Sequence, residues 1–562
     1  MATDISYLSQ EIQAELAQPN ARHDPAIIEN NAPLAKSIFH DAKEATEAEH
    51  KLKPVKGLRK YPKAVFWSVF VSLAVVMDGY DQSFLGSLYA EKAFQKHFGK
   101  PFKKGYQVPA PWQSGISNAS SVGVIIGILF NGWISERIGM KKTMLGAYVA
   151  ITGFIFILFF AESKAVLLVG EFLCGIPWGI FHTTAPAYAS EVCPVILRAY
   201  LTSFVNLSAI FGQLLAAGVL RGVEGMAGRW AYDIPFAIQW IWPVPLFIGM
   251  LFCPESPWWL IRKGRVEDAE HALQRLSTGA DTRQAIALMT RTTQEEKLTV
   301  GGNFFDVFKG TDRRRLEIAF CAWGIQTFSG LPLQGYNTYF FEQAGLDDSN
   351  AFGLSIGYYA IGFLGTVLSW FLLTSFGRRS IFLVGLSCMC VVLFTIGFVA
   401  IAPSTNRAAD WAQSILLVVW VFLYDISVGP VAWTIASEVS ATRLRRPTIA
   451  IARNSFYLSS IVWGVCVPYL LNPTAAGLKG KTAFVFAGTC LIAVAWTYFR
   501  LPETKGRTYE ELNILFWRQV PARKFKDESV DAYDEEQFVN PVVDEVLEKR
   551  AETHEHKAEA HL

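Results

Sequence analysis

Twelve apolar segments, each about twenty residues long, restrict the fold of this chain more than any other feature. They lie at about 65–88, 114–134, 142–161, 165–188, 199–220, 234–253, 316–341, 351–375, 379–402, 411–437, 447–470 and 481–500. Each is long enough to cross the hydrocarbon core of a bilayer. Because that core offers no water to unpaired backbone groups, such segments cross it as helices. The sequence therefore predicts an all-α membrane protein with twelve transmembrane helices, and a lipid bilayer as its surroundings.

Composition excludes several other classes of protein. Of the 562 residues, 51% are hydrophobic and only 18% are charged, and a net charge of +2 gives no basic surface for a nucleic acid. Most of the eight cysteines fall inside apolar segments, so we expect buried small side chains rather than disulfides or metal ligands. The sequence contains no Walker motif, HExxH motif or GxSxG elbow, which argues against an ATP-driven pump, an enzyme or a bound cofactor.

The charges outside the apolar segments predict the topology. Residues 1–63 are polar, lack the apolar core of a signal peptide and end in a basic run, so we expect a disordered cytosolic tail, with the first membrane helix directing insertion. The charged, helix-prone stretch 254–315 suits a cytosolic linker between an N-terminal half at 64–253 and a C-terminal half at 316–501. Residues 502–562 are then a second cytosolic tail. Loop 91–112 should be external although it holds five lysines.

An internal repeat supports this division into halves. The tetrapeptide ASEV at 189–192 recurs at 436–439, and in both copies an arginine follows seven residues after the glutamate. The pair Pro254-Glu255 after the sixth segment is repeated as Pro502-Glu503 after the twelfth. Two homologous six-helix halves in parallel arrangement are the architecture of major facilitator transporters.

Several motifs resemble those of the sugar porter family of the major facilitator superfamily. They are SERIGMKK at 135–142, PESPWWLIRKGR at 254–265 and PETKGRT at 502–508. CGIPWG at 174–179, YASEVCP at 188–194, PFAIQWIWP at 235–243 and VPARKF at 520–525 are similar to the fungal α-glucoside (maltose) permeases within that family. This resemblance implies a plasma-membrane importer that couples disaccharide uptake to protons. The first segment departs from the permeases, since MDGYDQ stands where they read EGYDT, so a different substrate stays open.

Two aspartates in the first apolar segment are candidates for proton coupling. Asp78 and Asp81 are three residues apart, so we expect them on roughly one helix face. Asp81 lies about 25 Å along a helix that begins near Ala64, at 1.5 Å per residue. A carboxyl in the membrane is costly and usually faces a wet cavity or a partner group. An interfacial position at the helix end is the alternative.

The resemblance makes Asp81 the proton-binding aspartate of the coupled sugar porters. In many of these porters an arginine on segment 4 is the charge partner of this aspartate, but this chain has Glu171 at that position. A carboxyl in low dielectric can take up a proton near neutral pH, and two neighbouring carboxyls would share one. We therefore expect Asp81, Asp78 and Glu171 to form the proton-coupling group, unless Glu171 points outward to the membrane surface.

Polar and aromatic side chains inside apolar segments are candidates for sugar binding. Amides donate to and accept from hydroxyls, and aromatic rings cover the apolar faces of pyranoses. Spacing puts Glu171, Trp178 and His182 on one face of segment 4, and Gln326 and Asn337 on one face of segment 7, which Pro332 should break. The family's asparagine contact on segment 7 is missing or is replaced by Gln334. The resemblance adds further sugar-binding candidates: Asn206 or Gln213 on segment 5, and Trp433 on segment 10. Interhelical packing is the alternative for each.

Charges at the proposed cytosolic turns are candidates for an inside gate that closes in one state of the carrier and opens in the other. The candidates are Arg137, Glu191, Arg198, Arg378, Glu438, Arg445 and Arg453. Arg453 lies too far toward the cytosol to serve Asp81 on this interpretation, so we expect it to pair with Asp425 or Glu438. Helix capping is the alternative for the charges at the turns.

Three functions remain open on the sequence. The first is a proton-coupled importer (a symporter) of sugars, with α-glucosides such as maltose favoured. The second is a transporter of another oligosaccharide, a monosaccharide or a polyol on the same fold. The third is a sugar sensor that does not transport, although such sensors have a longer cytosolic tail than the roughly sixty residues that follow segment 12 here. The predicted partners are therefore a sugar, protons and lipid.

Overall fold

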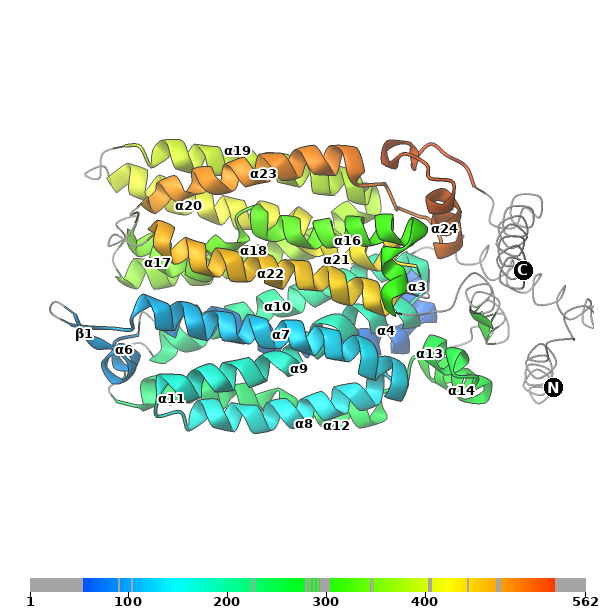
Figure 1. Ribbon diagram of the computed structural model, residues 1–562, viewed down its shortest axis with the longest axis horizontal. Coiled ribbons are helices and arrows are strands. Elements are labelled where there is room, and N and C mark those ends of the chain that lie inside the picture. The colour runs from blue at the N-terminus through cyan, green and yellow to red at the C-terminus, as the bar shows by residue number, and fades with distance from the viewer. Residues whose placement is uncertain are drawn as a thin grey trace, which may run out of the picture.

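The computed structural model is a long bundle of membrane-length helices (Figure 1). It describes residues 54–530 apart from short stretches within 89–90, 103–104, 224–227, 344–347, 403–406, 442–443 and 472–477 and most of 278–303. The expected disorder of the N-terminal tail falls outside these residues except at 54–63, where α3 (Pro54–Lys60) forms. Within the described part, eleven helices are long and apolar enough to cross a membrane.

The first six predicted segments match helices of the N-terminal half. These are α4 (Pro62–Ser72) with α5 (Val75–Leu88), α7 (Ala110–Ile138), α8 (Met140–Phe159), α9 (Lys164–Val192), α10 (Val195–Val223), and α11 (Trp230–Ile238) with η2 (Gln239–Ile241) and α12 (Pro243–Phe252). The stretch between the halves contains α13 (Pro257–Arg262), α14 (Val266–Leu276) and η3 (Phe304–Phe308).

The other six segments match helices of the C-terminal half. These are α16 (Gly310–Phe328) with η4 (Leu331–Tyr336) and α17 (Asn337–Gln343), α18 (Asp348–Ser375), α19 (Arg378–Val399), α20 (Arg407–Leu423) with η5 (Tyr424–Val428) and α21 (Gly429–Val439), α22 (Arg445–Leu471), and η6 (Lys479–Lys481) with α23 (Thr482–Arg500). The chain continues into α24 (Tyr509–Trp517) and η7 (Ala522–Lys524).

The seventh segment is missing from the eleven long apolar helices because α16 begins with several charged residues at 312–317 and is interrupted after Phe328. α16 ends at Phe328, Gly330 has a φ of +109°, and the 3₁₀ turn η4 follows with Pro332 near its start. A φ in this range is strained for residues with a side chain, so glycine permits the break. The expected interruption near Pro332 is therefore present, and the two helical pieces no longer share one rotational register.

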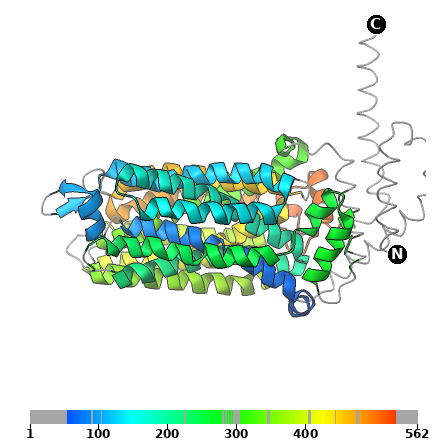
Figure 2. The ribbon, with the colours of Figure 1, turned by 90° about the horizontal axis from the view of Figure 1, so that it is seen from below.

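The two ends of the bundle carry different structures (Figures 1 and 2). One end, the hairpin end, has α6 (Lys92–Phe98) and an antiparallel hairpin of β1 (Lys100–Phe102) and β2 (Gly105–Gln107), in which Lys100 pairs with Gln107. The other, the linker end, has α3, α13, α14 and α24. The lysine-containing loop 91–112 thus lies at the opposite end from the linker between the halves, as the predicted topology requires.

The backbones of α5 and α10 pack directly against each other in the N-terminal half, because glycines leave no side chain between them. A Cβ added to Gly79 would lie 2.0 Å from the carbonyl oxygen of Ala209, and one added to Gly212 would lie 2.1 Å from that of Val76. Small residues at both positions let the helix backbones touch, as is common in membranes. The two halves meet where α10 packs on α18 and α21 and where α7 packs on α22.

The repeated glutamates Glu255 and Glu503 make the same kind of contact in both halves. Glu255 accepts hydrogen bonds from the backbone N–H groups of Met140 (3.0 Å) and Lys141 (3.1 Å) at the start of α8. In the second half, Glu503 accepts from the N–H of Arg378 (2.7 Å) at the start of α19. A carboxylate satisfies free N–H groups and complements the dipole at a helix N-terminus. The repeat therefore ties the same helix start to the same following segment in both halves.

Candidate functional site

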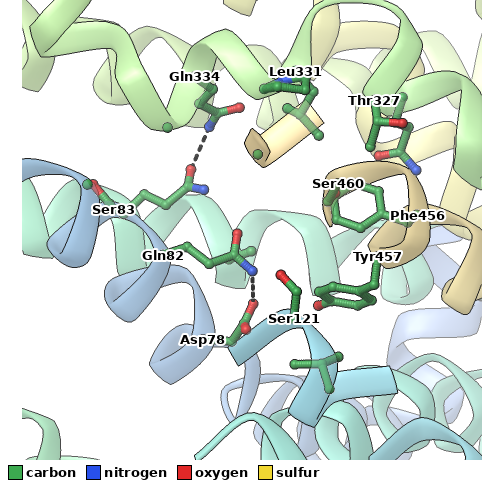
Figure 3. A pocket seen from close by; sticks show the side chains of 18 of the residues that line it. Asp78, Gln82, Ser83, Ser121, Thr327, Leu331, Gln334, Phe456, Tyr457 and Ser460 are labelled. Atoms are coloured by element: carbon green, nitrogen blue, oxygen red, sulfur yellow. Dashed lines mark hydrogen bonds between the residues drawn. The ribbon is translucent and has the colours of Figure 1, made fainter. Parts of the chain in front are cut away.

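A cavity of about 230 Å³ lies between the two halves of the bundle. Residues of α5, α7, α9 and α10 line it from the N-terminal half, and residues of α16, η4, α18, η5, α21 and α22 line it from the C-terminal half. Of the predicted site residues it is lined by Asp78, His182, Asn206, Gln213, Gln326, Trp433 and Arg453. Figure 3 shows Asp78 and Gln82 on α5 opposite Thr327, Leu331 and Gln334 of the C-terminal half, which gives the cavity a polar lining from both sides.

A hydrogen-bonded row in the cavity wall joins the two halves. The Asp78 Oδ2 atom lies 2.7 Å from His182 Nε2 and accepts from Gln82 Nε2 at 2.8 Å. His182 Nδ1 lies 3.4 Å from the Nη2 atom of Arg453 on α22. Asp78, His182 and Arg453 are all more than 95% buried, so the negative and positive charges of this row are placed together in low dielectric. The arrangement gives Asp78 a cationic neighbour, whereas the described residues around Asp81 are Gln239 and Glu171.

The expected pairing of Arg453 with Asp425 or Glu438 is wrong. The Arg453 guanidinium lies 4.2 Å from the ring centre of Trp323 and 4.7 Å from that of Trp433, and Nη2 donates to the Tyr457 hydroxyl at 3.3 Å. Aromatic faces attract a guanidinium electrostatically. Helical rise alone placed Arg453 far from the acids of segment 1, but the tilt and packing of α22 bring it to the cavity.

Asp81 lies behind the cavity wall and not in it. Its Oδ1 atom accepts from Gln239 Nε2 of η2 at 2.9 Å, and its carboxyl adjoins that of Glu171 on α9. Neither Glu171 oxygen accepts from a protein donor in the described part of the chain. Because two ionised carboxylates cannot hydrogen-bond to each other, a bond between Asp81 and Glu171 requires one shared proton.

Asp78 and Asp81 were expected on roughly one helix face and in one proton-coupling group. The structure instead places them in two different surroundings. Three residues turn an α-helix by about 300°, which leaves the two side chains roughly 60° apart. In a packed bundle this angle separates the cavity, which Asp78 lines, from the interface with α9 and η2, which holds Asp81. The proximity of Asp81 and Glu171 agrees with the depth that their positions along the helices predict.

Amide side chains of the C-terminal half are held by specific partners. Gln326 Oε1 accepts from the Tyr424 hydroxyl at 2.6 Å, while its Nε2 atom has no partner among the described residues. Gln334 Nε2 (labelled in Figure 3) donates to Gln213 Oε1 of α10 at 2.8 Å, so this amide pair joins the two halves at the cavity wall. Trp433 adds an aromatic face. These groups can donate to and accept from the hydroxyls of a polyhydroxylated ligand.

Asn337 and Trp178 do not line the cavity, contrary to expectation. Asn337 is the first residue of α17, and its Oδ1 atom accepts from the Thr338 N–H at 2.6 Å. Asn337 was expected on the same helix face as Gln326, eleven residues earlier. That expectation assumed one continuous helix, but the helix breaks between the two residues. Trp178 packs in the core of the N-terminal half. Of the stripe formed by Glu171, Trp178 and His182, only His182 reaches the cavity.

The charges at the linker end form two repeat-related clusters. Glu438 accepts from Arg378 Nη2 at 3.0 Å and from the Thr504 hydroxyl at 2.6 Å. Glu191 pairs with Arg262 Nη2 at 3.4 Å and accepts from the hydroxyl of Ser256. Each glutamate thus connects the end of a bundle helix to the segment that follows its own half.

Two predicted gate arginines meet on a single ring. Arg198 of α10 lies 4.0 Å and Arg445 of α22 lies 4.1 Å from the ring centre of Tyr509, which begins α24. The two arginines come from different halves, so Tyr509 joins the halves at the linker end. Arg137 instead lies exposed and stacks on Trp133 at 4.1 Å.

Sequence reasoning missed Gln239 and Tyr424. Gln239 donates a hydrogen bond to Asp81, and the Tyr424 hydroxyl donates one to Gln326. A glutamine in the middle of the apolar run PFAIQWIWP was a usable signal, since a buried amide needs a partner. For Tyr424 the sequence offers no comparable signal, because the ring of a tyrosine also packs well among apolar side chains.

Comparisons with known proteins give related chains of similar length. The family model described as "Sugar (and other) transporter" matches residues 67–516. Maltose permease MAL31 of Saccharomyces cerevisiae is 38% identical over 512 residues, which cover 89% of this chain and 83% of the permease. The general alpha-glucoside permease of the same yeast is 38% identical over 531 residues, which cover 92% of this chain and 85% of the permease.

Solved structures show the same fold at lower identity. The proton:xylose symporter XylE bound to 6-bromo-6-deoxy-D-glucose matches with a TM-score of 0.70 and 21% identity, over 81% of this chain and 100% of that one. An inward-open structure of the xylose transporter XylE from E. coli matches with a TM-score of 0.61 and 21% identity, over 80% of this chain and 98% of that one.

Proposed function

Because this chain belongs to the sugar transporter family, whose model spans residues 67–516, we propose that it is a proton-coupled importer of α-glucosides such as maltose. The predicted family and the predicted major facilitator fold are confirmed by the family match and the likeness to XylE. The choice of α-glucosides is supported by permeases of that specificity that are 38% identical over about 90% of this chain. As a transporter the chain needs neither a catalytic residue nor a cofactor.

The proposal includes a location and an orientation. The chain is a multi-pass membrane transporter, and we place it in the plasma membrane, where an importer of external sugar works. The linker end is the cytosolic end, because it holds the basic residues Arg378 and Arg379 and the linker between the halves. Both termini are then cytosolic. Residues 64–253 and 316–501 move as the two halves, with 254–315 as their linker and 502–562 as the C-terminal tail.

Sugar binds in the cavity between the halves in this proposal. Gln326, Asn206 and Gln213 supply amides, and Trp433 and His182 supply ring faces around them. Gln326 is the best placed of these groups, because its Nε2 atom is buried without a partner and can donate to a sugar hydroxyl. Gln334 bonds across the cavity to Gln213, so a sugar that displaces this contact can influence how the halves approach each other.

The single observation that carries proton coupling is the pair of adjoining acids Asp81 and Glu171, which has an amide partner in Gln239 and no cationic partner among the residues that the structure describes. An unpaired charge is expensive inside a membrane, so the outward-facing carrier holds a proton on this pair. Asp78, three residues away on the same helix, lines the cavity beside Gln82, which donates to it. A small rotation of α5 would therefore connect sugar occupancy to the access of Asp81 to water.

The linker-end contacts close the cytosolic side in this scheme. Glu438 with Arg378 joins α21 to α19, and Glu191 with Arg262 joins α9 to α13. Tyr509 of α24 joins α10 to α22 through Arg198 and Arg445. Their separation would open the cavity to the cytosol and release sugar and proton. Such a change exchanges one set of contacts for another and needs no covalent step.

The test is uptake of labelled maltose, sucrose, trehalose, glucose and a polyol in a host without its own sugar carriers, with external pH recorded at the same time. We expect accumulation of maltose accompanied by alkalinisation of the medium. Accumulation of glucose or the polyol alone would give the same fold a different substrate. Uptake without alkalinisation would remove the proton coupling, and absence of any uptake by a carrier present at the cell surface would favour a sensor.

A further inference from the structure

We propose that a second cavity, at the linker end of the N-terminal half, binds a membrane lipid whose headgroup carries a phosphate monoester. This cavity, the linker cavity, measures about 350 Å³ and lies between the start of α8 and the helices α13 and α14 (Figure 1). Cavities of this size accommodate small ligands. None of the described residues lines both this cavity and the one between the halves, so its ligand is separate from the transported sugar. The inference rests on the proposed orientation, in which the linker end faces the cytosol.

Positive charge exceeds negative charge in the linker cavity. The described lysines, arginines and carboxylates of its lining are Lys141, Lys142, Arg265, Arg275, Glu255 and Asp268. Both carboxylates are already engaged: Glu255 accepts from the backbone N–H groups at the start of α8, and Asp268 accepts from Arg265 Nε at 2.7 Å. Within the described chain, Lys141, Lys142 and Arg275 make no salt bridge to a carboxylate. The cavity therefore favours an anionic ligand.

Two of these cations are held against the end of α12. Lys141 Nζ donates to the carbonyl of Leu251 at 2.6 Å, and Arg275 Nη2 donates to the carbonyl of Phe252. These are the last carbonyls of α12, which its dipole makes electronegative. An ammonium has three N–H donors and a guanidinium has five, so both side chains keep donors for a phosphate oxygen. Lys142, which is exposed, adds a third cation from α8.

Exposed apolar side chains beside the linker cavity favour a lipid over a soluble phosphate compound. Leu251 and Phe252 at the end of α12 are 48% and 64% exposed, and Ile138, which lines the cavity, is 40% exposed. In a membrane bundle such side chains face acyl chains, so the neighbouring cations lie at the level of the headgroups. Basic pockets on the cytosolic side of membrane helices bind phosphorylated headgroups. A phosphate monoester brings up to two negative charges and three acceptor oxygens, whereas a phosphatidylcholine headgroup carries its own cation.

In the repeat-related place of the C-terminal half, the chain supplies a segment of its own. Arg379 donates to the carbonyl of Tyr498 at 2.7 Å, as Lys141 does to that of Leu251. There Arg523 of η7 stacks on the Tyr498 ring at 4.8 Å. The C-terminal tail therefore lies beside this position, whereas the corresponding position of the N-terminal half adjoins the linker cavity. The internal repeat alone does not account for the cavity.

The experiment measures binding of fluorescent phosphatidylinositol 4-phosphate to the full-length carrier in nanodiscs of phosphatidylcholine, without sugar. We expect saturable binding that unlabelled phosphatidylinositol 4-phosphate displaces and that phosphatidylinositol, which lacks the monoester, does not. Soluble inositol 1,4-bisphosphate should displace the probe about tenfold more weakly or less, because it lacks the acyl chains that hold a headgroup at the membrane. Displacement by the soluble compound at equal concentration would assign the cavity to a free phosphate and overturn the lipid. Absence of saturable binding would overturn the site.

Charge variants locate the binding. Lys142→Gln and Arg275→Gln should each weaken it about fivefold, as for loss of one cation near a membrane surface, and Arg275→Lys, which keeps the charge, should recover most of the affinity. Lys263→Gln is the matched control, because Lys263 is an exposed linker residue outside the cavity lining. Equal weakening in Lys263→Gln would mean general attraction to the linker and would overturn the site. Since no sugar is present, a carrier that binds the lipid but transports no maltose would contradict only the proposed function.

Discussion

His182 Nε2 lies 2.7 Å from Asp78 Oδ2, and the two residues are 104 positions apart in the chain. Through His182 Nδ1 this contact continues to Arg453, so one imidazole connects an acid of the N-terminal half with a base of the C-terminal half. The ring also lies 5.8 Å from that of Trp433. His182 is therefore placed where movement of the two halves and occupancy of the cavity would both change its surroundings.

We predict that His182→Gln lowers the rate of maltose uptake about tenfold or more while the carrier still reaches the cell surface. Glutamine keeps hydrogen-bonding groups but cannot span Asp78 and Arg453 as the ring does, and a buried charge left without its partner costs several kcal/mol. His271→Gln is the control, because His271 is exposed on α14. Wild-type uptake kinetics in His182→Gln would show that the row of three residues is not used.

Asp81→Asn should abolish accumulation of maltose against its gradient and also the sugar-induced alkalinisation. Asparagine is neutral in every state, so the proton cannot be loaded or released at this position. Exchange of external labelled maltose for internal unlabelled maltose should persist, because exchange needs only the loaded forms of the carrier. If Asp81→Asn still concentrates maltose in a proton-dependent way, the coupling group is elsewhere, and Asp78 in the cavity wall is the next candidate.

Glu171→Gln should shift the pH dependence of uptake to more acid values without abolishing maltose binding. In the wild type the carboxyl of Glu171 adjoins that of Asp81, so the two acids share one proton and titrate as a pair. Glutamine removes the second acid. Initial uptake rates measured across pH 4 to 8 would give the profile, and an unchanged profile would separate Glu171 from the coupling step.

Gln326→Ala should raise the half-saturation concentration of maltose about tenfold, because removal of a buried hydrogen-bonding group leaves its partners unsatisfied at about 1–3 kcal/mol. Asn337→Ala is the paired comparison. Asn337 lies outside the cavity, accepts from the Thr338 N–H of its own helix and contacts Tyr359 of the cavity wall from behind, so its variant should change maltose affinity much less than Gln326→Ala. An equal effect of both variants would mean that the two amides act through packing of the broken seventh segment.

Glu438→Gln and Tyr509→Leu should each slow net uptake while leaving surface expression intact. Glu438→Gln weakens the bond to Arg378, and Tyr509→Leu removes the ring that Arg198 and Arg445 share, so both reduce the stability of the state closed at the linker end. Trp517→Leu on the same short helix is a control, because Trp517 is 44% exposed. Normal transport rates in both test variants would assign these contacts to helix capping alone.

The sequence by itself determined the fold and much of the candidate list. Segment length, the repeat of ASEV and the Pro-Glu pairs depend on local composition and order, and these survive in the chain whatever its tertiary arrangement. They predict twelve membrane segments in two halves, and they identify Asp81, Glu171 and Gln326 as unusual polar residues in apolar surroundings.

Only the tertiary structure decided which of these residues act together. A helical period gives relative angles along one helix, but it fixes neither the rotation of that helix against its neighbours nor the register across a break such as the one at Gly330. Asp78 therefore meets His182 in the cavity while Asp81 meets Gln239 behind it. The contact of Arg453 with His182 joins residues 271 positions apart. Such contacts depend on how helices from both halves tilt and pack, and that information is absent from any single apolar segment.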